Sequence, residues 1–183
     1  MPQRIIDACC LINLYASRNV LDILRSLEGG LFVPDLVKGE SLFIRKEDDQ
    51  DQTILVPEAI DLTEALAEGL LHSCQLENET EAQHFVQFAT SVDDGEAICL
   101  ALAKCRNWMV ATDDRKAIRL AKAESISTIT TAEIVKLWAD SCNATDETTA
   151  EILQRIERYA RFSPRKDFPL HDWWGRLSSP SGQ

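Results

Sequence analysis

Three aspartates directly follow apolar stretches that have the composition of buried strands. Asp7 follows residues 4–6 (RII), and Asp113 and Asp114 follow residues 108–112 (WMVAT). In an open parallel α/β sheet, ligands bind at the carboxyl ends of the strands, near the point where the strand order reverses. The sequence therefore predicts that two different strands bring carboxylates to one edge of a sheet.

Two glutamates can join these aspartates. Glu40 lies a few residues beyond a second apolar run, and Glu96 lies in the first turn of the helix expected before WMVAT. The acids are too widely spaced for a local loop motif such as an EF-hand, so only tertiary folding could gather them. Several carboxylates in one pocket need a counter-charge, and all-oxygen ligation favours Mg²⁺ or Mn²⁺ over zinc. The candidate catalytic and metal-binding acids are Asp7, Glu40, Glu96 and Asp114, with Asp113 as a further metal ligand.

Each acid also has a purely structural interpretation. Asp93 followed by Glu96 has the pattern of a helix N-cap with an acid three residues later. Asp7 could cap the first helix, and Asp113 or Asp114 could cap the helix that follows them. For each acid alone the structural interpretation is favoured, but the set of acids in this order strengthens the prediction of a shared site.

Strands and helices are expected to alternate along the chain. Short apolar runs predict strands at residues 4–6, 31–34, 54–60, 70–76, 108–112 and 126–130. Helical spacing of apolar residues predicts helices at 8–14, 19–27, 35–44, 63–70, 79–89, 93–105, 115–123, 131–141 and 148–160. This alternation predicts an α/β fold with three layers, α/β/α, around a mostly parallel central sheet.

The length of 183 residues, with 45% hydrophobic and 27% charged residues, fits one globular domain. We expect the main domain over residues 1–145 and a C-terminal part over 146–183. In that part a helix precedes an extended arm, packed on the domain or on a partner, with Trp173 and Trp174 as interface residues. The N-terminus has too short an apolar core for a signal peptide or a membrane span, which predicts a cytoplasmic protein without a membrane partner.

The charge of −11 is unevenly distributed. Residues 40–100 carry 15 acids against 2 bases, whereas residues 101–123 carry 6 bases against 2 acids. The overall charge argues against nonspecific nucleic-acid binding, but the segregation allows a local basic patch. The six cysteines and three histidines lack the spacing of zinc ligands, and the cysteines are expected to be small buried side chains.

The four acidic blocks, taken in order, resemble the PIN domain, the fold of many small Mg²⁺-dependent ribonucleases. IIDACCLINL resembles the opening block, with Cys9 where the family has a small polar residue. FVPDLVKGESL resembles the second block and DDGEAICLALA the third, which adds Asp93 as an accessory residue. VATDDRKA resembles the fourth block, in which Thr112 precedes the aspartate pair. The resemblance covers roughly residues 4–135 and is greatest to the bacterial and archaeal single-domain type, which includes toxins of toxin–antitoxin pairs.

The resemblance implies a metal-dependent endoribonuclease that leaves a 5′-phosphate and a 3′-hydroxyl. In this hypothesis Mg²⁺ or Mn²⁺ activates a water, and Thr112 positions metal-bound water. Arg115, Lys116 and Arg119 are expected to contact the phosphates of the RNA, although a solvated helix face explains them equally well. The expected partners are an RNA substrate, an antitoxin protein and a second copy of the chain in a homodimer.

Three other functions remain open. The chain could be a catalytically inactive PIN-like binding or assembly module, since its net charge disfavours RNA affinity. A signalling receiver domain needs a phosphoacceptor aspartate after the third strand and a lysine after the fifth, and the sequence offers neither. An aspartyl phosphatase needs Asp-x-Asp after the first strand, whereas Asp7 is followed by Ala8 and Cys9.

Overall fold

A parallel sheet of five strands forms the centre of the protein. The structure is a computed structural model that describes residues 3–40 and 42–179. The strand order is β5-β2-β1-β6-β7, and all neighbouring strands in it are parallel. The strands are β1 (Arg4–Ile6), β2 (Leu31–Pro34), β5 (Leu71–Cys74), β6 (Met109–Ala111) and β7 (Thr128–Ile129). Because β2 lies on one side of β1 and β6 on the other, the carboxyl ends of β1 and β6 form the topological switch point.

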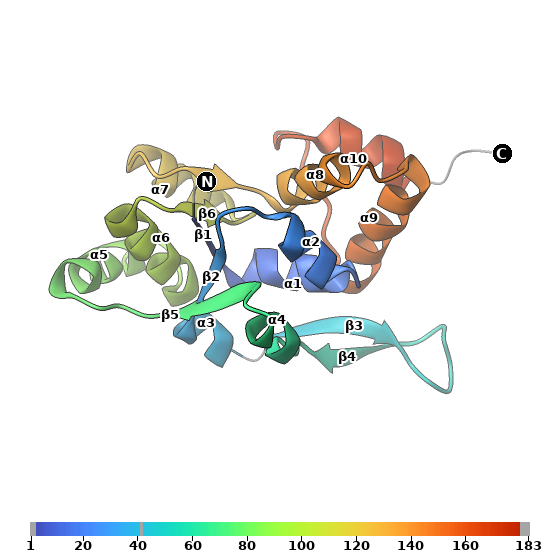
Figure 1. Ribbon diagram of the computed structural model, residues 1–183, viewed down its shortest axis with the longest axis horizontal. Helices are drawn as coiled ribbons and strands as arrows, with labels where there is room; N and C mark the ends of the chain where they lie inside the picture. The colour runs from blue at the N-terminus through green and yellow to red at the C-terminus, as the bar shows by residue number, and fades with distance from the viewer. Residues whose placement is uncertain (1–2, 41, 180–183) are drawn as a thin grey trace.

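Helices cover both faces of this sheet, which confirms the predicted three-layer α/β/α fold (Figure 1). One layer holds α5 (Glu79–Ala89), α6 (Asp94–Arg106) and α7 (Arg115–Ala123). The other holds α1 (Ala8–Ala16), α2 (Val20–Ser26), α8 (Thr131–Ser141), α9 (Asp146–Ala160) and α10 (His171–Ser178). Two short helices, α3 (Asp35–Gly39) and α4 (Thr63–Ala67), follow β2 and precede β5.

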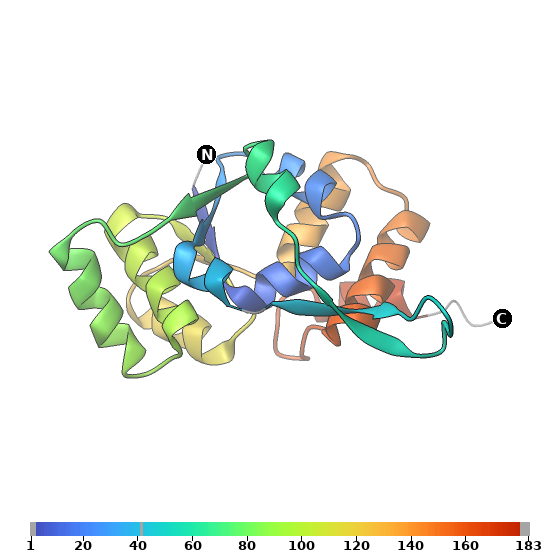
Figure 2. The same cartoon turned by 90° about the horizontal axis from the view of Figure 1, so that it is seen from below.

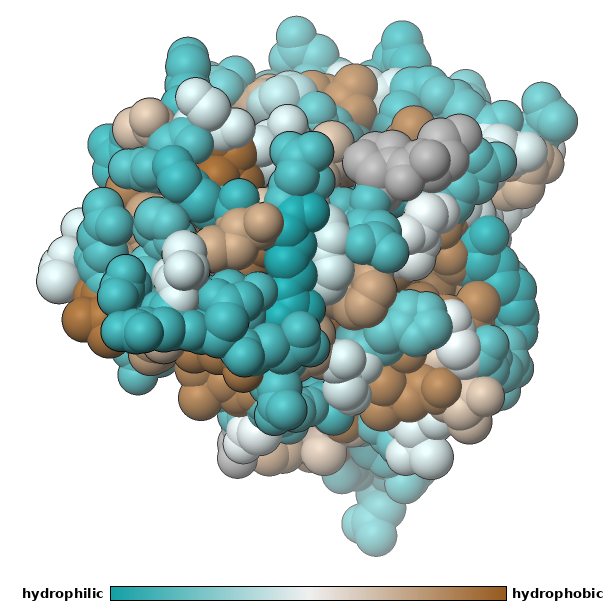
Figure 3. All heavy atoms as spheres, turned by 60° about the vertical axis from the view of Figure 1, so that its left-hand side comes forward, coloured by the Kyte–Doolittle hydropathy of each residue, from teal (hydrophilic) through white to brown (hydrophobic). Residues whose placement is uncertain are grey.

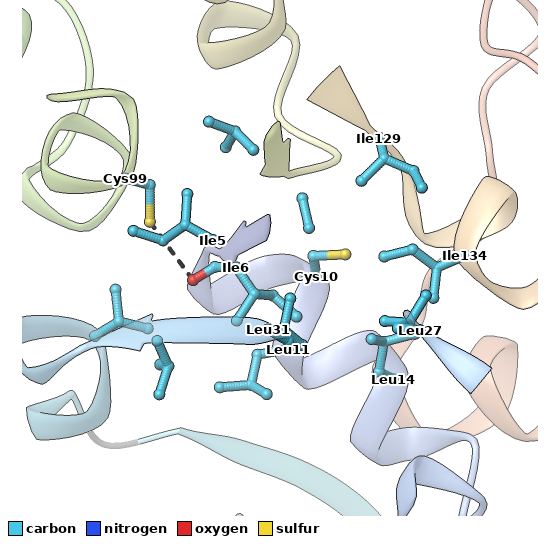
Figure 4. Packing of buried hydrophobic residues seen from close by; sticks show 14 of the residues in the cluster. Ile5, Ile6, Cys10, Leu11, Leu14, Leu27, Leu31, Cys99, Ile129 and Ile134 are labelled. Carbon is cyan, nitrogen blue, oxygen red and sulfur yellow. Dashed lines mark hydrogen bonds between the residues drawn. The ribbon is translucent and has the colours of Figure 1, made fainter. Parts of the chain in front are cut away.

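The core lies on both sides of β1. Ile5 and Ile6 are fully buried, as expected for a central strand that is covered on both faces. Figure 4 shows Leu14 of α1 and Ile134 of α8 on one side of this strand. On the other side the Cys99 thiol of α6 donates a hydrogen bond to the Ile6 carbonyl at 3.5 Å (Figure 4). The first strand is thereby fixed, and so is the position of Asp7 directly after it.

An antiparallel hairpin of β3 (Phe43–Glu47) and β4 (Leu55–Ala59) projects from the domain and packs against α1 and α9 (Figures 1 and 2). It corrects the helix predicted over residues 35–44. That helix ends at Gly39, and Glu40 is its C-terminal cap instead of a residue within it. Local spacing misled the prediction because pairing with β4, a distant segment, determines the conformation of Phe43 and Ile44.

Residues 146–179 pack on the domain itself. Three side chains of α9 enter the core, namely Ile152, Leu153 and Ile156. The arm predicted to be extended contains α10, whose Trp174 is only 1% exposed and donates an indole hydrogen bond to Glu157 at 2.7 Å. The interface role predicted for Trp174 is therefore wrong, because its own chain buries the ring.

One face of the protein is largely polar. Figure 3, which brings the α5 side forward, shows a mostly hydrophilic face with scattered hydrophobic side chains. No helix in the described ranges is long and apolar enough to cross a membrane.

Replacing Trp174 by alanine is expected to lower the free energy of unfolding by about 3–5 kcal/mol, because a large side chain leaves the core. Urea denaturation measures the change. Trp173→Ala is the matched control, since that ring is only partly buried, and it should cost clearly less. Equal losses for both variants would contradict the packing of α10 described above.

Candidate active site

Three aspartates cap the helices that begin at the carboxyl edge of the sheet. Asp7 caps α1, Asp93 caps α6 and Asp114 caps α7. Each carboxylate accepts a hydrogen bond from the backbone amide three residues later, at 2.8, 2.8 and 2.9 Å respectively. The predicted caps are thus confirmed, and Asp114 caps α7 where the sequence also allowed Asp113. Capping places all three acids at the same edge, so the structural role and membership of a shared site are compatible.

Asp7 is the most deeply buried acid of this group, at 2% exposure. The Cys9 thiol lies 3.1 Å from both of its carboxylate oxygens and donates to them. Burial raises the pKa of Asp7 to about 7, despite hydrogen bonds from Thr112 and the two cysteines that follow it. The nearby charge of Asp113 raises this pKa further.

Thr112 joins Asp7 to Asp114. Its side chain is hydrogen-bonded to the Asp7 carboxylate, and its hydroxyl accepts a hydrogen bond from the Asp114 backbone amide at 3.1 Å. Thr112 is fully buried, so it orients these two acids from the interior of the protein.

Glu96 shares the electrostatic environment of these aspartates. Its pKa is raised to about 7, first by burial and then by the charges of Asp93, Asp114 and Asp7. Folding therefore gathers three of the four predicted catalytic acids, together with the predicted accessory Asp93.

Glu40 lies beside the start of α6. Burial and the charge of Asp93 raise its pKa. A Cβ atom placed on Gly95 would lie 2.7 Å from the Glu40 Oε1 atom, so a larger residue there would displace the Glu40 carboxylate. The structure thus brings Glu40 next to Asp93.

Asp113 makes different contacts. It accepts hydrogen bonds from the Asn13 side chain at 2.9 Å, from the Thr131 backbone amide at 3.0 Å and from the Thr131 hydroxyl. Burial raises its pKa. Asp113 therefore ties the end of β6 to α1 and α8. Asn13 was missed from the sequence, where the signal was a polar residue within the apolar face of the first helix.

A cavity of about 490 Å³ opens beside these acids. One wall comes from the acidic edge and α1, and the other from the segment that follows α9. The lining residues are Cys9, Ile12, Asn13, Glu96, Asp113 and Asp114 on the first wall, and residues 160–165 with Phe168 on the second. Arg161 and Arg165 on the second wall were not predicted. Their only signal was the excess of bases over acids in the C-terminal part of the chain.

The predicted phosphate-binding cations lie on α7, directly behind Asp114. Arg115 and Arg119 line a smaller hollow of about 270 Å³ together with Phe168, which also lines the acidic cavity. Arg115 pairs with Asp167 at 3.4 Å, and both side chains are largely exposed. Lys116 is exposed on the first turn of the helix.

A family model described as a PIN domain matches residues 3–166. The chain belongs to the PIN domain family, as the sequence predicted. The match includes α9 and most of the segment that forms the second wall of the acidic cavity. Comparisons with curated proteins and with solved structures found no match.

PIN domains typically use divalent metal ions. Within residues 3–40 and 42–179, no three Asp, Glu, His or Cys side chains are arranged to hold an ion between them. The donor atoms are nevertheless hard oxygens, and burial with the charges of neighbouring carboxylates raises the pKa values of Asp7 and Glu96. Mg²⁺ is commonly held through one or two carboxylates, with water and substrate phosphate completing its coordination. The residues present fit such an open site.

Replacing Asp7 by asparagine should stabilise the fold in metal-free buffer above pH 7. The pKa of this carboxyl is about 7 in the fold, against 3.8 for a free aspartate, so ionised Asp7 disfavours folding. This cost is absent below about pH 4, grows as the pH rises to 7, and then remains at roughly 2–4 kcal/mol. Urea denaturation in EDTA at pH 4 and pH 8 measures the gain, which should appear only at pH 8.

Asp49→Asn is the control, because Asp49 is 90% exposed and its pair with Lys46 is 3.8 Å long. It should change stability by less than about 0.5 kcal/mol at either pH. An Asp7→Asn protein that is no more stable than the parent at pH 8 would refute the stated burial cost.

Proposed function

We propose that this protein is a metal-dependent endoribonuclease. Membership of the PIN family supports nuclease activity. The observation that carries the proposal is the cluster of Asp7, Glu96 and Asp114 at the switch point, where burial and mutual repulsion raise two pKa values to about 7 beside an open cavity. Such a cluster attracts a divalent cation and the phosphate that the cation bridges.

A divalent cation bound at these carboxylates would activate the attacking water and neutralise charge on the phosphate. Glu96 lines the cavity, and its pKa of about 7 lets its carboxylate take up a proton near neutral pH. The Cys10 amide and the Cys9 thiol hold the Asp7 carboxylate in one orientation. These contacts preorganise the site for hydrolysis of a phosphodiester bond, and the resemblance to PIN ribonucleases implies a 5′-phosphate and a 3′-hydroxyl as the products.

Cations surround the acidic cavity on two sides. The predicted contacts Arg115, Lys116 and Arg119 lie on α7, and the C-terminal wall adds Arg161 and Arg165. In a chain with a net charge of −11 these arginines provide a local site for phosphates without making the whole surface attractive to RNA.

The test is cleavage of labelled single-stranded RNA by the purified protein in Mn²⁺, with Mn²⁺ binding followed by calorimetry. Asp7→Asn and Glu96→Gln should each lower cleavage by more than about a hundred-fold, since loss of an outer residue of a metal site already costs about 10–100-fold. Glu79→Gln, an exposed acid in the first turn of α5, should cleave like the parent. An Asp7→Asn protein that binds Mn²⁺ and cleaves like the parent would refute this function.

A catalytically inactive binding module is the second candidate. It is favoured by the finding that, in the described part of the chain, no three potential ligands are arranged around one ion. The calorimetry and the cleavage assay separate the two functions. An inactive module would neither bind Mn²⁺ nor cleave RNA.

We also propose that the protein acts as the toxin of a toxin–antitoxin pair, inhibited by a small antitoxin protein. Induced expression of the parent in a bacterial host should arrest growth within a few generations, whereas Asp7→Asn should not. Both proteins must accumulate to equal levels on immunoblots. Unimpaired growth with abundant, RNA-cleaving parent protein would exclude the toxin role while leaving the nuclease function intact.

A further inference from the structure

A second hollow of about 380 Å³ continues from the acidic cavity onto the β3–β4 hairpin. We call it the hairpin groove. Its lining residues are Ile12, Phe43, Ile44, Arg45, Leu55, Pro57, Tyr159, Ala160 and Arg161. Ile12, Ala160 and Arg161 also line the acidic cavity, so the two hollows share a border. Figure 2 shows the hairpin running from beneath α1 toward the C-terminal end of the molecule.

Phe43 presents an open aromatic ring in this groove. It is 50% exposed, although it belongs to a strand that packs against α1 and α9. Its partner across the hairpin is Ala59, and the partner of Arg45 is Pro57. Because alternate residues of a strand face the same side, Phe43 and Arg45 lie on one face of β3, opposite small or cyclic residues that leave the ring uncovered.

Two arginines line the same groove as this ring and have no partners among the described residues. Among the described residues, Arg45 and Arg161 form no ion pair and no side-chain hydrogen bond. The nearest acid along β3, Glu47, is already bound by Tyr159 at 2.8 Å and by Arg158 at 3.0 Å. Uncompensated cations beside an exposed aromatic ring are the features with which proteins hold single-stranded nucleic acid, by phosphate contact and base stacking.

We propose that the hairpin groove binds the single-stranded RNA segment adjoining the bond to be cut. A base stacks on Phe43, while Arg45 and Arg161 contact the flanking phosphates. This assignment rests on the proposed ribonuclease function, since the groove opens directly into the acidic cavity. A duplex is excluded as the occupant because its base faces are covered by neighbouring bases and cannot reach Phe43.

The test is fluorescence anisotropy with a short fluorescein-labelled single-stranded RNA in EDTA, where binding is measured without cleavage. Phe43→Ala should raise Kd at least about five-fold, as expected for loss of one base–aromatic stack. Arg45→Ala should raise Kd and lower the slope of log Kd against log salt by about 0.7, the value for one phosphate contact on a single strand. Circular dichroism melting verifies that each variant is folded.

The chain offers a matched control for each variant. Lys46 neighbours Arg45 but does not line the groove, so Lys46→Ala removes the same charge away from it. Ile54 is 52% exposed but does not line the groove, so Ile54→Ala removes an equally exposed apolar side chain. Both controls should keep the Kd and the salt dependence of the parent.

The inference is overturned if the parent fails to bind single-stranded RNA, if Phe43→Ala and Arg45→Ala bind like the parent, or if the controls lose as much affinity. Tighter binding of the matching DNA strand would also overturn the assignment to RNA. A parent that binds RNA through Phe43 but does not cleave it in Mn²⁺ would refute the ribonuclease function alone. A parent that cleaves RNA with a Phe43→Ala variant of equal affinity would refute the groove alone.

Discussion

A backbone hydrogen bond at the start of a helix fixes three of the aspartates at the carboxyl edge of the sheet. Capping requires a short acceptor side chain directly before the first helical turn, and Asp7, Asp93 and Asp114 meet this requirement at α1, α6 and α7. A parallel sheet forces helices to begin at its carboxyl edge, so three caps necessarily converge there. The positive ends of the helix dipoles also favour carboxylates at these places. The fold therefore assembles an acidic cluster from three local interactions, each of which is stabilising alone.

The cluster as a whole opposes folding. Burial and repulsion raise the pKa values of Asp7, Glu96 and Glu40, so the ionised side chains disfavour the native state at neutral pH. The apolar packing around β1 and the network of Asp113 with Asn13 and Thr131 hold the edge together against this repulsion. Functional sites commonly contain side chains that lower the stability of the native state in this way. A bound cation would relieve it, which couples ligand binding to the stability of the domain.

The sequence was most informative where structure depends on neighbouring residues. Strand ends, helix caps and the alternation of strands with helices follow from local patterns, which is why Asp7 and Asp93 could be predicted as helix caps. It was least informative where distant segments meet. The strand at Phe43 depends on its pairing with Ala59, and the burial of Trp174 depends on α9. Neither contact leaves a periodic pattern, because the residues that decide it lie elsewhere in the chain.

The role of Asp113 illustrates the same limit within the site. The sequence alone does not distinguish the two adjacent aspartates, and only the hydrogen bonds of Asp113 to α1 and α8 separate them. Asp114 faces the start of its own helix, whereas Asp113 faces Asn13 and Thr131, which are far from it in sequence. The position of the cavity wall that contains Arg161 and Arg165 could not be predicted from the sequence either, because it depends on where α9 ends.

That wall has a consequence for how the protein is made. A ribosome has already produced all the clustered acids once Asp114 is synthesised, whereas residues 160–168 are synthesised only later. The helix before them supplies Ile152, Leu153 and Ile156 to the core, so a nascent chain without this helix lacks both part of its core and one side of the cavity. Because domains generally fold as units, the fold and the cavity are completed together. A chain released too early would thus present its carboxylates without an enclosed place for a substrate.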